Sequence, residues 1–221
     1  MANQLDLEEQ EQLDELKHFW KQYGNSITWV LIVVLSAFAA WNGYQYWTRT
    51  QAAQAAAMYD EVERVVATGD VAMAERAFGD MKERFARTAY AQQAGLLLAK
   101  TAVEKAKPET AKSVLTWVSE KSTDEGFAAI AKLRLAGLLI EEKSLDAALK
   151  ILEGSPPSEF KGLFSDRKGD IYALQAKPNE AKQAYLAAFT ALDERSDYRR
   201  LVEIKLNALG GHVPADAEGK K

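Results

Sequence analysis

Cysteine is absent from this 221-residue sequence, and histidine occurs only at His18 and His212. Without thiols the chain cannot form disulfides, use a cysteine nucleophile or bind zinc through cysteine. A chain without thiols is compatible with oxidising and reducing compartments alike, so this absence leaves the compartment open.

The sequence also lacks a phosphate-binding glycine loop, an HExxH pair and a nucleophile-elbow motif. His18 and His212 lie near opposite ends of the chain, where neither is suited to a buried catalytic triad. A carboxylate-based hydrolase stays open, because paired acids leave no mark in a sequence. We expect a protein that is not an enzyme, with no catalytic, cofactor-binding or metal-binding residues and no cofactor.

Charge is distributed unevenly along the chain, whose formal net charge is −4. Residues 1–48 hold two basic and six acidic side chains, whereas the remainder holds 26 of each sign. A body without net charge and without a basic stripe does not attract nucleic acid. Nucleic acid is therefore not an expected partner.

A long stretch without charged side chains runs from Gln22 to Thr48. A helix over residues 23–44 would rise about 31–33 Å, which matches a hydrocarbon core of roughly 30 Å. Aromatic side chains suited to the headgroup level stand near both ends of the stretch: Trp20, Tyr23 and Trp29, then Trp41, Tyr44, Tyr46 and Trp47. The pattern predicts one transmembrane anchor over residues 24–48, preceded by a tail over residues 1–23.

Two other interpretations of this stretch are weaker. A buried core helix could have the same composition, and Ala37-Phe38-Ala39 has the small-x-small form of a signal-peptide cleavage site. However, the residues before Ile27 are acidic overall, and the uncharged segment continues well past the site. We therefore favour an uncleaved anchor.

Basic residues near the anchor predict its orientation. Lys17 and Lys21 precede it, and Arg49 is the only basic residue close to its other end. Positive charge stays on the cytoplasmic side, so we expect a cytoplasmic N-terminus and the large C-terminal part across the membrane, which in a Gram-negative cell is the periplasm.

Two helical faces stand out in this region, one expected near the membrane surface and one within the membrane. The tail has apolar residues at the spacing of a short amphipathic helix: Leu13, Leu16 and Trp20. The anchor has small residues along one face, where another membrane helix could approach closely or lipid could lie: Ser36, Ala40 and Gly43.

Alanines recur after the anchor at spacings of 37, 37 and 33 residues: Ala74, Ala111, Ala148 and Ala181. Large apolar residues follow each of them by four positions: Phe78, Leu115, Leu152 and Tyr185. Mostly small residues precede each by twelve positions: Val62, Ala99, Ala136 and Gly169. Small residues where two helices cross are typical of tetratricopeptide hairpins, although any helical bundle can repeat alanine.

The repeat predicts an all-α fold, in which a single transmembrane helix precedes a tetratricopeptide-like solenoid over residues 49–209 and a flexible tail over residues 210–221. About four hairpins are expected, over residues 51–85, 90–121, 126–153 and 159–193. A capping helix over residues 197–209 would cover the end of the stack.

Stacked hairpins form a concave surface that receives peptides or partner domains. Projecting the repeat inward predicts the side chains of this groove: Gln93, Lys100, Val103, Glu104, Leu133, Ile140, Glu141, Asp166 and Asp170. Each could equally be an ordinary solvent-facing residue, so the prediction applies to the group.

Three segments of this sequence resemble the YfgM family of bacterial inner-membrane proteins, ancillary subunits of the SecYEG translocon. They are WNGYQYW from Trp41 to Trp47, FSDRKGDIYAL from Phe164 to Leu174 and LVEIKLNAL from Leu201 to Leu209. With the acidic tail and the degenerate repeats, the resemblance covers about residues 8–211.

The resemblance implies a non-catalytic protein that associates with SecYEG and with the periplasmic chaperone PpiD and handles newly exported polypeptides. A membrane-anchored repeat scaffold for another envelope assembly machine is the alternative. Either is an interaction protein held at the membrane by one helix.

Overall fold

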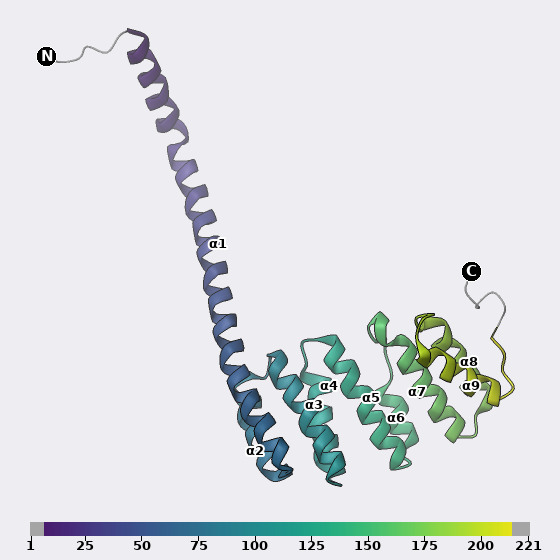
Figure 1. The fold of residues 1–221 in the computed structure, drawn as a ribbon. Coiled ribbons are helices and arrows are strands. Elements are labelled where there is room, and N and C mark those ends of the chain that lie inside the picture. The colour runs from purple at the N-terminus through teal and green to yellow at the C-terminus, as the bar shows by residue number, and fades with distance from the viewer. Residues whose placement is uncertain (1–6, 214–221) are drawn as a thin grey trace. The chain divides into compact units, whose positions relative to one another are not determined.

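The computed structural model describes residues 7–213, and the side chains from Glu11 to Val213. Within these residues the fold is all-α, with nine α-helices, one short 3-10 helix (Ser158–Phe160) and no strand (Figure 1). Two compact units divide the chain between Gln51 and Ala52. The all-α class predicted from the repeat is confirmed.

Helix α1 (Leu7–Thr68) runs through the predicted tail and anchor and on into the first repeat hairpin. The sequence predicts a separate short helix in the tail, whereas the described part of the tail is continuous with the anchor in one helix. Residues 1–6 of the tail lie outside the described residues. The helix continues because no proline stands between its ends, and Gly24 and Gly43 each cost only about 1 kcal/mol. It ends at Thr68, and the next residue, Gly69, has a φ of 76°, a conformation that suits glycine.

The apolar part of α1 is long enough to cross a membrane, and no other helix among the described residues is both as long and as apolar. Only 6% of its most apolar window is buried within the structure. A core helix of a soluble domain would instead be covered by protein on all sides. Exposed apolar side chains over the length of a bilayer fit a membrane span.

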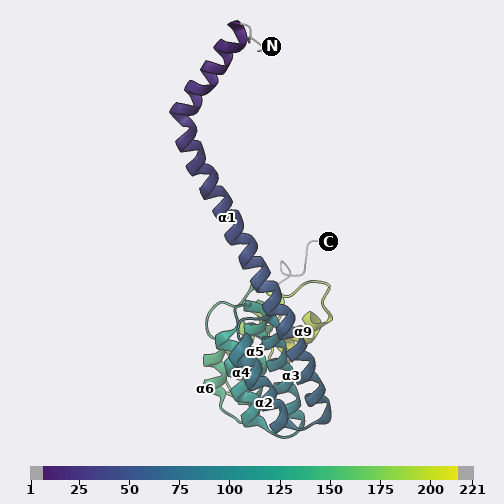
Figure 2. The ribbon, with the colours of Figure 1, turned by 90° about the vertical axis from the view of Figure 1, so that its left-hand side faces the viewer.

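From Ala52 onward, four antiparallel hairpins stack side by side (Figures 1 and 2). The last part of α1 pairs with α2 (Val71–Phe85). The other hairpins and the final helix are α3 (Ala89–Glu104) with α4 (Pro108–Lys121), α5 (Glu125–Glu141) with α6 (Leu145–Ile151), α7 (Lys161–Leu174) with α8 (Pro178–Ala191), and α9 (Asp197–Ala208). The predicted solenoid of about four hairpins with a capping helix is confirmed.

The turn inside each hairpin has one residue with positive φ at the same place in the repeat: Gly69, Ala106, Lys143 and Ala176. In the last three turns, main-chain hydrogen bonds of the Schellman type close the first helix, as from Lys107 N–H to the Ala102 carbonyl at 2.7 Å. The backbone thus repeats even where glycine is missing.

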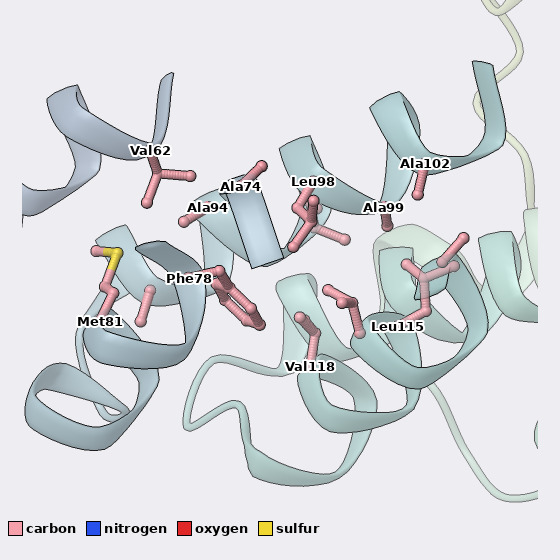
Figure 3. Close-up of a cluster of buried hydrophobic side chains, with 14 of the residues drawn as sticks. Val62, Ala74, Phe78, Met81, Ala94, Leu98, Ala99, Ala102, Leu115 and Val118 are labelled. Atoms are coloured by element: carbon pink, nitrogen blue, oxygen red, sulfur yellow. The ribbon is translucent and has the colours of Figure 1, made fainter. Parts of the chain in front are cut away.

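Small residues lie where the helices cross, as the sequence predicts. Ala74, Ala111, Ala148 and Ala181 are fully buried. Larger side chains fill the spaces around the crossings in the first two hairpins, among them Val62, Phe78, Met81 and Leu115 (Figure 3). This core fixes the positions of the faces that remain outside it.

The end of α9 is closed by Gly210 and Gly211, whose N–H groups bond to the carbonyls of Asn207 and Leu206. These glycines belong to the segment predicted as a flexible tail. Residues 214–221 of that segment lie outside the described residues.

Candidate interaction surfaces

The predicted small-residue stripe of the anchor lies on an exposed part of α1. Ser36, Ala40 and Gly43 are all exposed, and a side chain at Gly43 would meet no atom within 4 Å. The stripe therefore leaves room for the close approach of a second helix. Its role in helix association stays a prediction.

A hollow of about 560 Å³ lies between α3 and α5, with one residue each from α4 and α7. It is lined by Ala99, Lys100, Val103, Glu104, Leu115, Leu133, Arg134, Gly137, Leu138, Glu141 and Arg167. Five of the nine predicted groove residues are among them: Lys100, Val103, Glu104, Leu133 and Glu141. The structure therefore brings together, on one concave surface, five of the residues that the repeat register predicted.

Polar contacts join the helices around the hollow at two places. Midway along α5, the Arg134 guanidinium donates a hydrogen bond of 3.1 Å to the Leu96 carbonyl of α3. Just past the C-terminal end of α5, the Lys112 ammonium of α4 lies 2.8 Å from the Glu142 carboxylate. Hydrogen bonds to Glu109 and then Glu142 raise the pKa of Lys112. The two contacts tie α5 to both helices of the preceding hairpin.

Gly137 lies on the floor of the hollow. A Cβ atom added there would meet no atom within 4 Å, so the missing side chain keeps this part of the floor open. Apolar side chains of Val103, Leu133 and Leu138 also line the hollow. Apolar surface with a few charged groups at its edge is typical of peptide-binding sites.

Gln93 and Ile140 do not line the hollow. Gln93 is exposed and Ile140 is half-buried against the core of the third and fourth hairpins. Asp166 and Asp170 lie elsewhere, in a polar cluster that joins α7 to α8 and α9.

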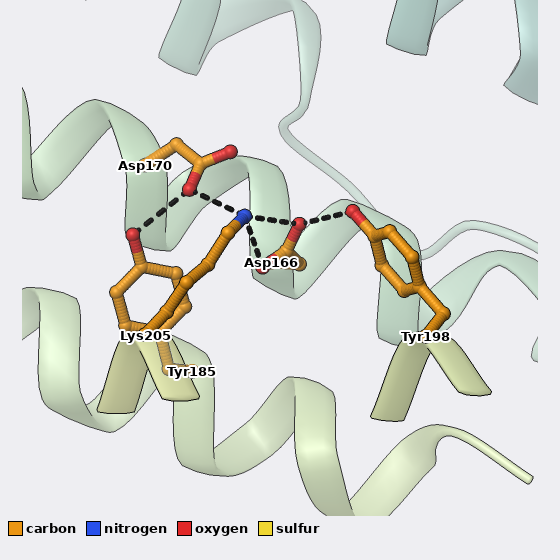
Figure 4. A network of polar contacts seen from close by, with 5 residues as sticks. All are labelled: Asp166, Asp170, Tyr185, Tyr198 and Lys205. Carbon is orange, nitrogen blue, oxygen red and sulfur yellow. Dashed lines mark hydrogen bonds and ion pairs between the residues drawn. The ribbon is translucent and has the colours of Figure 1, made fainter. Parts of the chain in front are cut away.

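The polar cluster consists of Asp166, Asp170, Tyr185, Tyr198 and Lys205 (Figure 4). The Lys205 ammonium lies 2.9 Å from both oxygens of Asp166 and 2.8 Å from Oδ1 of Asp170. The Tyr198 hydroxyl donates a 2.6 Å hydrogen bond to Asp166, and the Tyr185 hydroxyl donates one of 2.8 Å to Asp170. Asp166 is only 1% exposed, so its charge depends on these partners.

Burial raises the pKa values of the Tyr185 and Tyr198 hydroxyls above the ordinary 10.0. Their hydrogen bonds to Asp170 and Asp166 raise these pKa values further, because a phenolate could not donate them. Sequence reasoning missed the cluster because Lys205 is 39 residues from Asp166, and no spacing rule connects them.

Among the residues that the structure describes, no group of three or more His, Asp or Glu side chains is arranged to hold a metal ion. Two described surfaces stand out, the exposed small-residue face of α1 and the hollow.

Comparison with known proteins finds relatives over most of the chain. A family model described as a tetratricopeptide repeat-like domain matches residues 17–211, which include the anchor. A Neisseria gonorrhoeae protein named ancillary SecYEG translocon subunit is 30% identical over 204 residues, covering 92% of this chain and 98% of that protein. Proteins of the same name from Haemophilus influenzae and Escherichia coli are 28% and 26% identical, over 92% and 91% of this chain and 98% and 96% of theirs. No solved structure matches the chain.

Proposed function

Because this chain belongs to the YfgM family of ancillary SecYEG translocon subunits, we propose that it is a non-catalytic inner-membrane protein that associates with SecYEG. One observation carries the proposal: the similarity to the Neisseria gonorrhoeae relative covers nearly the full length of both chains. The anchor and the repeat domain are therefore both part of what the two proteins share.

The proposed topology has residues 1–23 in the cytoplasm, residues 24–48 in the membrane and residues 49–209 in the periplasm. Two lysines before the anchor and one arginine after it support this orientation. An exported chain would then emerge on the same side of the membrane as the hollow.

The proposed role of the repeat domain is to link newly exported polypeptides with periplasmic chaperones such as PpiD. A tether raises the effective concentration of the hollow near the translocon exit, so weak contacts there become frequent. The face with Ser36, Ala40 and Gly43 is proposed as the contact with a translocon helix. Segments of exported chains are proposed to occupy the hollow.

Photo-crosslinking in cells tests both contacts. Probes replace Ala40 on the small-residue face and Lys100 at the hollow, with matched probes at Phe38 on another face of α1 and at the exposed Asn179 of α8. We expect Ala40 to crosslink to a SecYEG subunit, and Lys100 to exported chains or PpiD, more strongly than the matched probes do.

Crosslinks to a different envelope machine would replace the translocon assignment with the scaffold alternative. A second test removes residues 1–48 and restores export with an unrelated signal peptide. The tethering account predicts that co-purification with the translocon is lost, and unchanged co-purification would contradict it.

A further inference from the structure

Arginines from two neighbouring hairpins occupy the same place in the repeat at the hollow. Arg134 of α5 stands two residues before the small residue Ala136, and Arg167 of α7 stands two residues before Gly169. Both line the hollow. Because α5 and α7 are the first helices of successive hairpins, the equal register forms a row of positive charge along one edge.

Glutamates form a second row in the same way. Glu104 stands five residues after Ala99 of α3, and Glu141 stands five residues after Ala136 of α5, and both line the hollow. These glutamates are the last residues of α3 and α5, where the helix dipole adds partial negative charge.

The two rows are separated by apolar surface. Arg134 and Glu141 are seven residues apart, two turns of α5, which corresponds to about 10.5 Å along the helix axis. Gly137 lies between them and leaves the floor open. Lys100 lies 3.8 Å from Glu104, but both side chains are more than half exposed, so this pair contributes little.

We propose that the hollow binds an extended polypeptide segment with one acidic and one basic side chain about three residues apart and an apolar side chain between them. In the extended polyproline II conformation three residues make one turn and rise about 9 Å, so side chains three apart share a face at close to the separation of the two rows. The acidic side chain would pair with the arginines, whose planar groups suit carboxylates, and the basic one with the glutamates.

The proposal rests on the proposed function only for the source of the segment, an unfolded exported chain. Unfolded chains offer short segments of many charge patterns, and the hollow selects among them by charge and spacing. Selection of this kind is strongest at low ionic strength, because salt screens exposed charges.

Binding of synthetic peptides to the full chain in lipid nanodiscs tests the proposal. End-capped fluorescent peptides share one apolar core and differ in charge: opposite charges three residues apart, the same charges seven residues apart, two acidic, two basic, or uncharged. Fluorescence anisotropy should rank the first peptide highest. We expect each lost or misplaced charge to weaken binding by up to about fivefold.

Variants at the hollow separate binding from folding. Gly137→Trp should abolish binding of every peptide by filling the open floor, and the matched Gly137→Ala should retain most of it. Glu141→Lys should reverse the charge preference, so that the two-acid peptide binds best. Circular dichroism and urea unfolding of each variant establish that the fold is kept.

Equal binding of all the peptides, or a Gly137→Trp variant that binds as the parent protein does, would overturn the proposal. So would conversion of a dimer to a monomer by Gly137→Trp in sedimentation, because the hollow would then be a contact between copies of the chain. Charge-selective peptide binding without crosslinks to exported chains in cells would refute the proposed function alone. Crosslinks from Lys100 without charge selection would refute only this inference.

Discussion

The Lys205 ammonium of α9 lies 2.9 Å from both carboxylate oxygens of Asp166, which is buried in α7. This ion pair ties the final helix to the first helix of the fourth hairpin. Apolar contacts of Val202 and Leu206 with the core complete the attachment. The stability of α9 therefore depends in part on the charge of Asp166, a carboxylate that is almost completely shielded from solvent.

Replacing Lys205 by methionine should destabilise the C-terminal end of the solenoid by about 3 kcal/mol, because the Asp166 carboxylate loses its counter-ion. Hydrogen exchange followed by mass spectrometry should show that the substitution speeds the exchange of α9 relative to the parent chain, and that it speeds the exchange of the distant α3 less. Arg64→Met, which removes an exposed pair with Glu61, is the matched control and should change stability by less than about 0.5 kcal/mol. Unchanged exchange in α9 would contradict the role given to Lys205.

Stability should fall as the pH rises past 10, because burial and hydrogen bonding raise the pKa values of Tyr185 and Tyr198 in the folded chain. In that range the unfolded chain releases phenol protons that the folded chain retains. The contribution of these tyrosines is therefore complete below pH 10 and is lost above it. Urea unfolding at a series of pH values measures this dependence.

The double variant Tyr185→Phe and Tyr198→Phe should have a flatter pH dependence above pH 10 than the parent chain. It should also be less stable at neutral pH, by roughly 1–3 kcal/mol for each hydrogen bond to a carboxylate that is lost, although Lys205 still donates to both carboxylates. An alkaline slope identical to that of the parent chain would show that other groups cause it.

Ala106→Gly should stabilise the solenoid. Ala106 has a φ of 53°, a conformation that costs an L-residue about 1–2 kcal/mol, and it is exposed. After allowing for the greater freedom of glycine in the unfolded chain, we expect a gain of about 0.5–1 kcal/mol. The matched control, Ala187→Gly inside α8, should lose a similar amount, and loss of stability in both would contradict the strain at Ala106.

Two helical glycines should respond in opposite ways to alanine. At Gly169 a Cβ atom would lie 2.5 Å from the Tyr185 ring, so Gly169→Ala should cost roughly 1–3 kcal/mol. At Gly137 the space is open, so Gly137→Ala should gain about 0.5–1 kcal/mol from helix propensity alone. Urea unfolding of the full chain in detergent measures both, and equal effects would contradict the packing at Gly169.

The repeat register was predictable because it is local. Alanines at helix crossings fix which face of each helix is inward, and the turns follow at constant distances, so the hairpins could be placed from the sequence. The continuity of α1 was not predictable, because amphipathic tail, apolar anchor and repeat helix have different patterns and no residue marks where a helix does not end.

The groove was predictable only in part, because repeat register does not reveal contacts between helices that are far apart in the sequence. Register predicted that Asp166 and Asp170 line the groove, but it could not show that Lys205 of α9 pairs with both of them. Arg134 and Arg167 were missed because the projection did not extend to their position in the repeat. The signal that could have found them is the recurrence of arginine two residues before the small residue in two successive hairpins.

The left-handed turn residues have a consequence for detecting such repeats. Glycine, alanine, lysine and alanine occupy the same backbone position, and in the last three turns main-chain hydrogen bonds hold the conformation without glycine. Glycine therefore does not mark this position in every copy, and sequence profiles that expect it there will undercount the copies. A profile that scores the spacing between turns would recover diverged members of such arrays.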